Sequence, residues 1–268
     1  MDPPMPSPPL PAQDLTRQDL PFVAECRPLR WNAAFGWLAA GARDLRRAPR
    51  VTLVYGLASF VVSWAVSWLA WQLGRMALLA AFLSGFIFVA PLLAMGLHAV
   101  ARDLEAGRMP SVRRSLRQQA RAVGHAAVYA LILLVVMFTW SRSGMMLYAF
   151  FEVESGDPRV LAEFLAVGSL IGTAFAAMVF ASAAFSLPMV VDRDADMVTA
   201  VLSSVHAVLR NKAALATWAL CIVGLTAVGF ATGYLGFIWL MPWLAYAAWH
   251  GYRDTLAPDP WPALPEAG

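Results

Sequence analysis

The sequence has few charged residues and almost no cysteine. Of its 268 residues, 14% are charged and 60% are hydrophobic, and the mean hydropathy is +0.61. A soluble domain usually has about 25% charged and about 45–50% apolar residues. This balance excludes an ordinary soluble domain. The two cysteines, Cys26 and Cys221, are too few for a disulfide framework, a cysteine zinc site or a haem attachment motif.

The N-terminus lacks the basic region and the apolar stretch of a secretory signal. Residues 1–28 instead contain 8 prolines and few large apolar side chains, which predicts a disordered tail. We expect a membrane domain over residues 29–256 and a short C-terminal tail over 257–268.

Six apolar runs are close to the length of about 20 residues that a membrane-spanning helix needs. They cover residues 51–73, 76–100, 124–151, 161–191, 213–234 and 235–252. We expect the third to be broken near its outer end by Ser141–Gly144. The sequence therefore predicts an all-α polytopic membrane protein.

Positive charge predicts the orientation of these spans. Of the 20 lysines and arginines, 17 flank one side, and the other side has only Arg75, Arg142 and Arg159. The positive-inside rule places the larger set in the cytoplasm together with both termini. These basic residues are expected to face anionic lipid headgroups, and the absence of a basic-aromatic recognition module argues against nucleic acid as a partner.

An internal repeat relates the second and sixth spans. Gly85, Pro91, Arg102–Asp103 and Ala106 recur 151 positions later as Gly236, Pro242, Arg253–Asp254 and Ala257. Three amphipathic segments precede the hairpins, with apolar stripes at helical spacing; they are Trp31-Phe35-Leu38-Ala42-Leu45, Val112-Leu116-Ala120-Val123 and Met197-Val201-Val205-Val208. We expect three tandem hairpins in parallel repeats, each preceded by a cytoplasmic amphipathic helix in the headgroup plane.

Three segments, in order, carry a family resemblance: Gly85–Gly96 with Arg102 and Glu105; Phe185–Asp194 with Thr199–Ser204 and Asn211; and Trp249–Asp254. Together they resemble DUF2189, a bacterial family of predicted integral membrane proteins, over about Trp37 to Leu256. The resemblance implies a multi-pass protein of a Gram-negative inner membrane with no established function. Tyr246 stands where the family often has a second histidine, which argues against a two-histidine metal or haem site there.

The sequence offers no catalytic, cofactor or metal motif. The four histidines, His98, His125, His206 and His250, all fall at the predicted cytoplasmic interface, and no two have ligating spacing. No carboxylate lies in the middle of a span, where proton-coupled transporters usually carry one. We therefore expect no enzyme and no cofactor.

Two functions fit these features. The first is a non-enzymatic inner-membrane component that acts through contacts with lipid or with protein, either another membrane protein or a second copy of the chain. The second is a small-solute or lipid transporter built on the repeats. A polar cavity between the repeats would favour the transporter, and a solid apolar bundle would favour the first function.

Ionisable residues at the cytoplasmic ends of the spans form the candidate functional cluster. They are Arg102, Asp103, Asp192, Arg193, Asp194, His250, Arg253 and Asp254. The arginines complement the partial negative charge of helix C-termini and can reach lipid phosphates. Two interpretations remain: separate interfacial anchors, or a ring in which Arg–Asp contacts link different hairpins.

Overall fold

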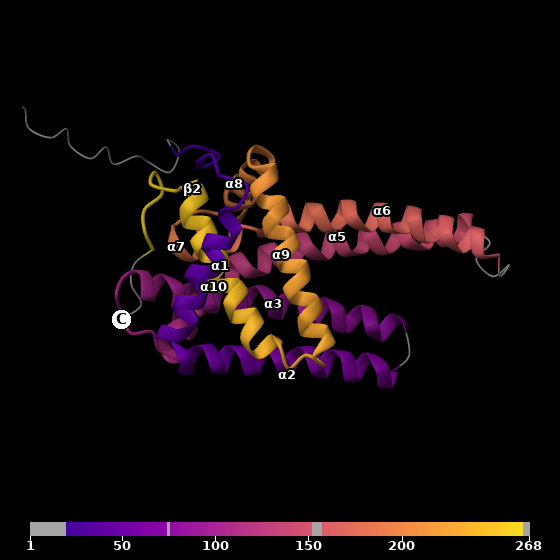
Figure 1. Ribbon diagram of the computed structural model, residues 1–268, viewed down its shortest axis with the longest axis horizontal. Coiled ribbons are helices and arrows are strands. Elements are labelled where there is room, and N and C mark those ends of the chain that lie inside the picture. The colour runs from indigo at the N-terminus through magenta and orange to yellow at the C-terminus, as the bar shows by residue number, and fades with distance from the viewer. Residues whose placement is uncertain (1–19, 74–75, 152–156, 265–268) are drawn as a thin grey trace, which may run out of the picture.

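The structure is a computed structural model that describes residues 20–73, 76–151 and 157–264; for residues 69–70, 73 and 76–90 it describes the backbone alone. It is almost entirely helical in these ranges (Figure 1). The helices are α1 (Ala33–Arg47), α2 (Pro49–Leu73), α3 (Met76–Glu105), α4 (Val112–Arg121), α5 (Val123–Phe150), α6 (Pro158–Ala183), α7 (Ser186–Asp192), α8 (Met197–Arg210), α9 (Lys212–Ala231) and α10 (Phe237–Thr255). Two short strands, β1 (Glu25–Cys26) and β2 (Leu256–Ala257), pair antiparallel.

The molecule has two parts. All residues of its buried hydrophobic cluster lie within residues 24–55, 91–130, 182–218 and 244–264, which we call the base. The remaining parts of α2, α3, α5, α6, α9 and α10 are the arms. The α2–α3 and α5–α6 pairs project from the same side of the base (Figure 1).

Four helical stretches are long and apolar enough to cross a membrane. They are Pro49–Trp68, Val123–Phe150, Pro158–Asp192 and Lys212–Ala231, and the chain buries only 22%, 17%, 0% and 22% of their most apolar windows. Apolar side chains exposed on this scale need a lipid or protein cover. The chain is therefore a multi-pass membrane protein whose arms turn apolar faces outward.

The predicted second and sixth spans are not among these four stretches. The second, 76–100, forms part of α3, and its side chains up to residue 90 lie outside the described residues. The sixth, 235–252, forms most of α10. Here α10 crosses α2 so closely that an added Cβ at Gly56 would clash with the Ile238 carbonyl.

Two predicted spans have a different internal structure from the one expected. The third is unbroken, since α5 continues through Phe150; Thr139 and Ser143 donate hydroxyl hydrogen bonds to carbonyls one turn earlier, which keeps these polar residues in the helix. The fourth, expected to be continuous to residue 191, breaks between α6 and α7. Pro188 cannot donate to the Ala184 carbonyl, and helical hydrogen bonding restarts after this point.

Parts of both predicted tails contact the base. Residues 24–28 belong to the base: β1 pairs with β2, the Ala24 amide donates to Ser203 Oγ at 2.9 Å, and the Asn211 amide donates to the Arg27 carbonyl at 3.1 Å. At the other end, Trp261 is buried against the base. Proline density indicated disorder, but these backbone groups find fixed partners in the base. Residues 1–19 of the predicted tail lie outside the described residues.

The three amphipathic helices are held by small or polar faces. In α1, Gly41 packs so closely on α10 that an added Cβ would lie 2.8 Å from the Ala247 nitrogen. In α8, the buried face includes Ser203 and Ser204. The large side chains of the predicted stripes are divided: Phe35 and Leu116 are exposed, whereas Met197 is buried in the hydrophobic cluster. The stripes therefore face the base only in part.

Candidate functional site

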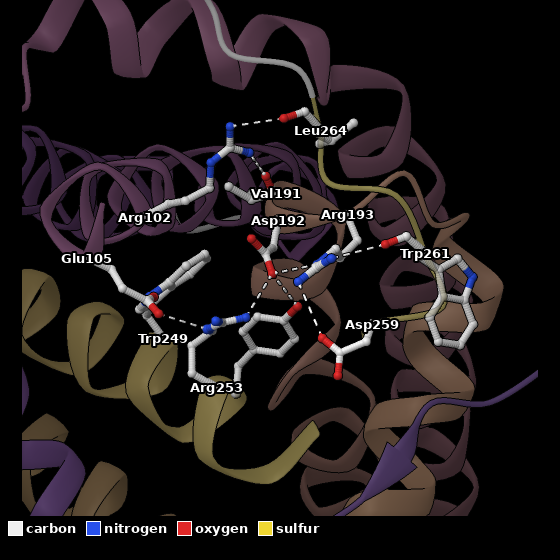
Figure 2. A network of polar contacts seen from close by, with 11 residues as sticks. Arg102, Glu105, Val191, Asp192, Arg193, Trp249, Arg253, Asp259, Trp261 and Leu264 are labelled. Atoms are coloured by element: carbon white, nitrogen blue, oxygen red, sulfur yellow. Dashed lines mark hydrogen bonds and ion pairs between the residues drawn. The ribbon is translucent and has the colours of Figure 1, made fainter. Parts of the chain in front are cut away.

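Asp192, the last residue of α7, is the centre of a polar network in the base (Figure 2). Its Oδ2 accepts hydrogen bonds from Tyr252 Oη at 2.8 Å and from Arg193 Nε at 3.1 Å, and lies 3.4 Å from Arg253 Nη1. The carboxylate side chain is only 12% exposed. Three donors therefore converge on one oxygen of a largely buried carboxylate.

Arg253 joins this carboxylate to α3. Its Nε donates to Glu105 Oε1 at 3.0 Å, and Trp249 Nε1 donates to Glu105 Oε2 at 2.7 Å. Partial burial disfavours the charged guanidinium, but the charges of Glu105 and Asp192 outweigh it and raise the pKa of Arg253. One arginine of α10 therefore connects the ends of α3 and α7, which belong to different predicted hairpins.

Two further arginines fix the C-terminal segment. Arg102 in α3 donates to the carbonyls of Val191 at 2.6 Å and Leu264 at 3.4 Å. Arg193 donates to the Trp261 carbonyl at 3.1 Å and lies 3.8 Å from Asp259. Figure 2 shows the segment beside the two arginines, with dashed lines from Arg102 to Leu264 and from Arg193 to Trp261.

Backbone contacts hold the same segment. The Leu264 amide donates to the Asp192 carbonyl at 3.0 Å, and the Asp194 amide donates to the Pro262 carbonyl at 2.9 Å. The short C-terminal segment is therefore integrated into the network through main chain as well as side chains.

Other residues of the predicted cluster have separate partners. Asp103 forms a local pair with Arg108 at 3.1 Å and is almost fully buried. Asp254 accepts a hydrogen bond from Trp37 Nε1 of α1 at 3.0 Å. These two aspartates contact a loop and a helix within the base, whereas the Arg–Asp contact between different predicted hairpins is Arg253–Asp192, at 3.4 Å.

His250 also contacts a residue outside the network. Its Nε2 is 2.7 Å from Asp44 Oδ2, and Arg47 is 3.7 Å from the other oxygen of Asp44. His98, which was predicted at the cytoplasmic interface, stacks on Trp249 with ring centroids 6.5 Å apart. Of the eight predicted residues, the structure joins three side chains directly, Asp192, Arg193 and Arg253. A fourth, Arg102, binds the backbone carbonyl of Val191 beside Asp192.

The cluster predicted from sequence omitted several members of the network. Glu105, Trp249 and Tyr252 supply a carboxylate, an indole donor and a phenol donor. All three fall in the segments that carry the family resemblance, which was the signal that could have identified them. Their roles depend on contacts between distant segments, and periodicity does not reveal such contacts.

The network is a structural clamp, because its contacts hold separate elements of the base together. Its carboxylates are occupied by guanidinium, indole and phenol groups from other elements. Within the ranges that the structure describes, no group of three or more histidine, cysteine, aspartate or glutamate side chains could hold a metal ion. The network joins α3, α7, α10 and the C-terminal segment into one unit.

Comparison with known proteins supports the membrane assignment. Residues 78–192 match the model of the family DUF2189, described as a predicted integral membrane protein. This confirms the family resemblance, over a shorter range than Trp37 to Leu256, and the range includes Arg102, Glu105 and Asp192. No curated protein and no protein of solved structure shows a significant match to the chain.

Proposed function

We propose that this DUF2189 chain is a non-enzymatic component of a bacterial inner membrane whose arms contact lipid or partner membrane proteins. The observation that carries the proposal is the low self-burial of the four apolar stretches, which is at most 22%. In α6 the large side chains Leu161, Leu165 and Leu170 are exposed. Such faces are suited to partners that are themselves apolar.

The base supplies the rigidity that this role needs. Arg253 and Asp192 couple α10, α3 and α7 across the base, and partly buried charge-assisted hydrogen bonds hold such junctions in a defined geometry. Fixed junctions set the spacing at which the arms enter the membrane. The base is therefore a support, and the arms are the contact surfaces.

The alternative, a small-solute or lipid transporter, finds less support. The main cavities among the described residues lie in or beside the base or open on outer surfaces; one of about 590 Å³ is an open groove on α5 from Phe138 to Met146. A transporter normally binds its substrate near the membrane midplane between repeats. These positions favour the contact role.

The proposed topology has six spans in three tandem hairpins with both termini in the cytoplasm, where α3 and α10 supply the two spans beyond the four apolar stretches. Reporter fusions after Arg114, after Arg210 and at the C-terminus should report a cytoplasmic location. A fusion near Gly156 should report the periplasm. A cytoplasmic signal at Gly156 would contradict the span count or the orientation.

Photo-crosslinking tests the contact role. A photoreactive residue at Leu170, exposed on α6, should react in cells with phospholipid acyl chains or with a membrane protein. The same residue at Met109, exposed in the α3–α4 connection, is the matched control and should not label acyl chains. Equal acyl-chain labelling at both positions would contradict the distinct roles of arms and base.

A flux assay separates the two functions. Proteoliposomes of the full chain should move neither fluorescent phospholipid between leaflets nor small solutes across the membrane faster than empty liposomes do. Protein-dependent flux would replace the contact role with the transporter.

A further inference from the structure

A small basic cavity lies in the base, beside the network. It has a volume of about 80 Å³, and its described lining consists of Arg102, Gln118, Arg121, Ala122, His125, Val190, Val191 and Leu264. A single water needs about 10–15 Å³, so the cavity has space for a larger group. The lining contains two arginines, an amide and an imidazole, and none of these described residues is acidic.

Arg102 provides positive charge without a carboxylate partner in the described part of the chain. Its hydrogen bonds go to the backbone carbonyls of Val191 and Leu264. These bonds use two of the five N–H groups of a guanidinium. Partly buried cations are usually paired with an anion, so this arginine is suited to one supplied from outside the chain.

Gln118 gives a second, independent observation. Its Oε1 atom is buried and has no hydrogen-bond partner among the residues that the structure describes. Rotation of the amide by about 180° exchanges this oxygen for the NH₂ group, and an amide so turned donates to an oxyanion. A cation would also satisfy the oxygen, but Arg102 and Arg121 in the same lining would repel it.

The position of the cavity indicates where the anion comes from. Ala122 and His125 lie at the start of α5, at one end of the apolar stretch Val123–Phe150. The N-terminus of α5 also carries partial positive charge from backbone N–H groups. The end of a membrane-spanning stretch is the level at which headgroup phosphates lie.

We propose that this cavity binds a phosphate group, either the headgroup of an anionic phospholipid or free inorganic phosphate. Arg102 and Arg121 supply charge, and Gln118 and His125 supply hydrogen-bond donors. This inference rests on the proposed function, because it names one of the lipid contacts. It adds a discrete site in the base to the apolar contacts of the arms.

Calorimetric titration of the full chain in a neutral detergent tests the site. The two probes are dioctanoyl phosphatidylglycerol and inorganic phosphate. Binding of the lipid alone assigns a headgroup site, and binding of inorganic phosphate alone, or of both in competition, assigns a site for the phosphate group itself. Binding of neither probe to the wild-type chain overturns the proposal.

Adjacent positions in α4 provide matched variants. Gln118→Glu places a carboxylate in the cavity, and Arg117→Gln removes one positive charge outside its lining, so both lower the net charge by one. We expect Gln118→Glu to weaken binding by about ten-fold or more, because it repels the anion, and Arg117→Gln to change it by less than about two-fold. Equal weakening in both variants overturns the proposal in favour of diffuse surface attraction.

Arg102→Gln is a second test inside the cavity, with the same expected loss as Gln118→Glu. Its thermal unfolding is measured in parallel, because Arg102 also holds Val191 and Leu264. A folded Arg102→Gln chain that binds the probe as tightly as wild type overturns the proposal. Crosslinking at Leu170 is independent of all these variants, so failure of the cavity and failure of the arm contacts can be told apart.

Discussion

Leu215 and Leu220 lie five positions apart in α9, yet Leu215 is 1% exposed and Leu220 is 72% exposed. The first belongs to the base and the second to an arm, and the two side chains also lie on different faces of the helix. Cys221 and Ile222, next to Leu220, still pack against the buried cluster. The same contrast extends through the molecule, since the buried hydrophobic cluster lies in the base and the apolar stretches of the arms bury little within the chain. One helix therefore contributes to two environments.

The difference in burial indicates that the base and the arms have different roles. In the base, helices meet through small residues such as Gly41 and through ion pairs such as Arg253–Asp192. In the arms, apolar side chains of similar size are left for the surroundings. Substitutions should therefore affect folding in the base and contacts with the surroundings in the arms.

A large effect is expected at the centre of the base network. Asp192→Asn removes the charge that faces Arg193 and Arg253, and breaking a buried ion pair costs about 3–5 kcal/mol. We expect destabilisation near the lower end, about 3 kcal/mol, because Asn still accepts one hydrogen bond. Thermal unfolding in detergent measures it. Asp259→Asn, at an exposed carboxylate 3.8 Å from Arg193, is the control and should cost less than about 1 kcal/mol; equal losses would contradict a central role for Asp192.

Leu215 and Leu220 in α9 test the difference between the base and the arms directly. Leu215→Ala should lower the free energy of unfolding by about 2–5 kcal/mol, because it opens a cavity in the buried cluster. Leu220→Ala should change it by less than about 0.5 kcal/mol. Both variants are measured by denaturant unfolding in the same detergent. Similar losses for the two would mean that Leu220 is covered by a second copy or by another part of the chain.

Two glycines of α1 test its close contact with α10. Gly41→Ala should destabilise by about 1–3 kcal/mol, because the new methyl group meets the backbone of Ala247 and overpacks the contact. Gly36 has open space around it, so Gly36→Ala should stabilise the helix by about 0.5–1 kcal/mol. Opposite signs in thermal unfolding are the expected result. A stabilising Gly41→Ala would show that α1 does not lie this close to α10.

The smallest effect concerns a helix cap. Asp196 accepts from the Thr199 amide at 2.9 Å at the start of α8, and Asp196→Ala should cost about 1 kcal/mol at neutral pH. Partial burial raises the pKa of Asp196, but hydrogen bonds from Thr199 and neighbouring backbone N–H groups outweigh it and lower the pKa overall. A lowered pKa in the folded state gives stability that is present above about pH 4 and is lost at lower pH. The difference between wild type and variant should therefore shrink in acid, and a constant difference would contradict this.

Asp157, which caps α6 at the far end of an arm, is the matched control. Asp157→Ala should fray the end of α6 without changing the main unfolding transition, because this cap lies outside the buried cluster. Hydrogen exchange detects the fraying.

Much of the helical architecture could be predicted from the sequence, because helices depend on residues a few positions apart. The apolar runs identified α2, α5, α6 and α9 as membrane helices, and the three amphipathic stripes identified α1, α4 and α8. The family segments contained Glu105 and Tyr252, although their role in the network was not foreseen. The local pattern was misleading at Pro188, where the predicted fourth span breaks, and at Ser143, whose hydroxyl bonds within an unbroken helix.

The sequence by itself determined that this chain is helical, crosses the membrane more than once and places ionisable residues at helix ends, since composition and short-range periodicity specify these properties. Only the tertiary structure decided which charges meet. Asp192 and Tyr252 are 60 positions apart, and Glu105 and Arg253 are 148 apart. No short-range pattern links such residues, because their contact depends on how close-packed faces such as Gly41 on Ala247 orient whole helices. That packing placed some of the eight candidate residues in one network and others in separate contacts. It also formed the basic cavity beside the network.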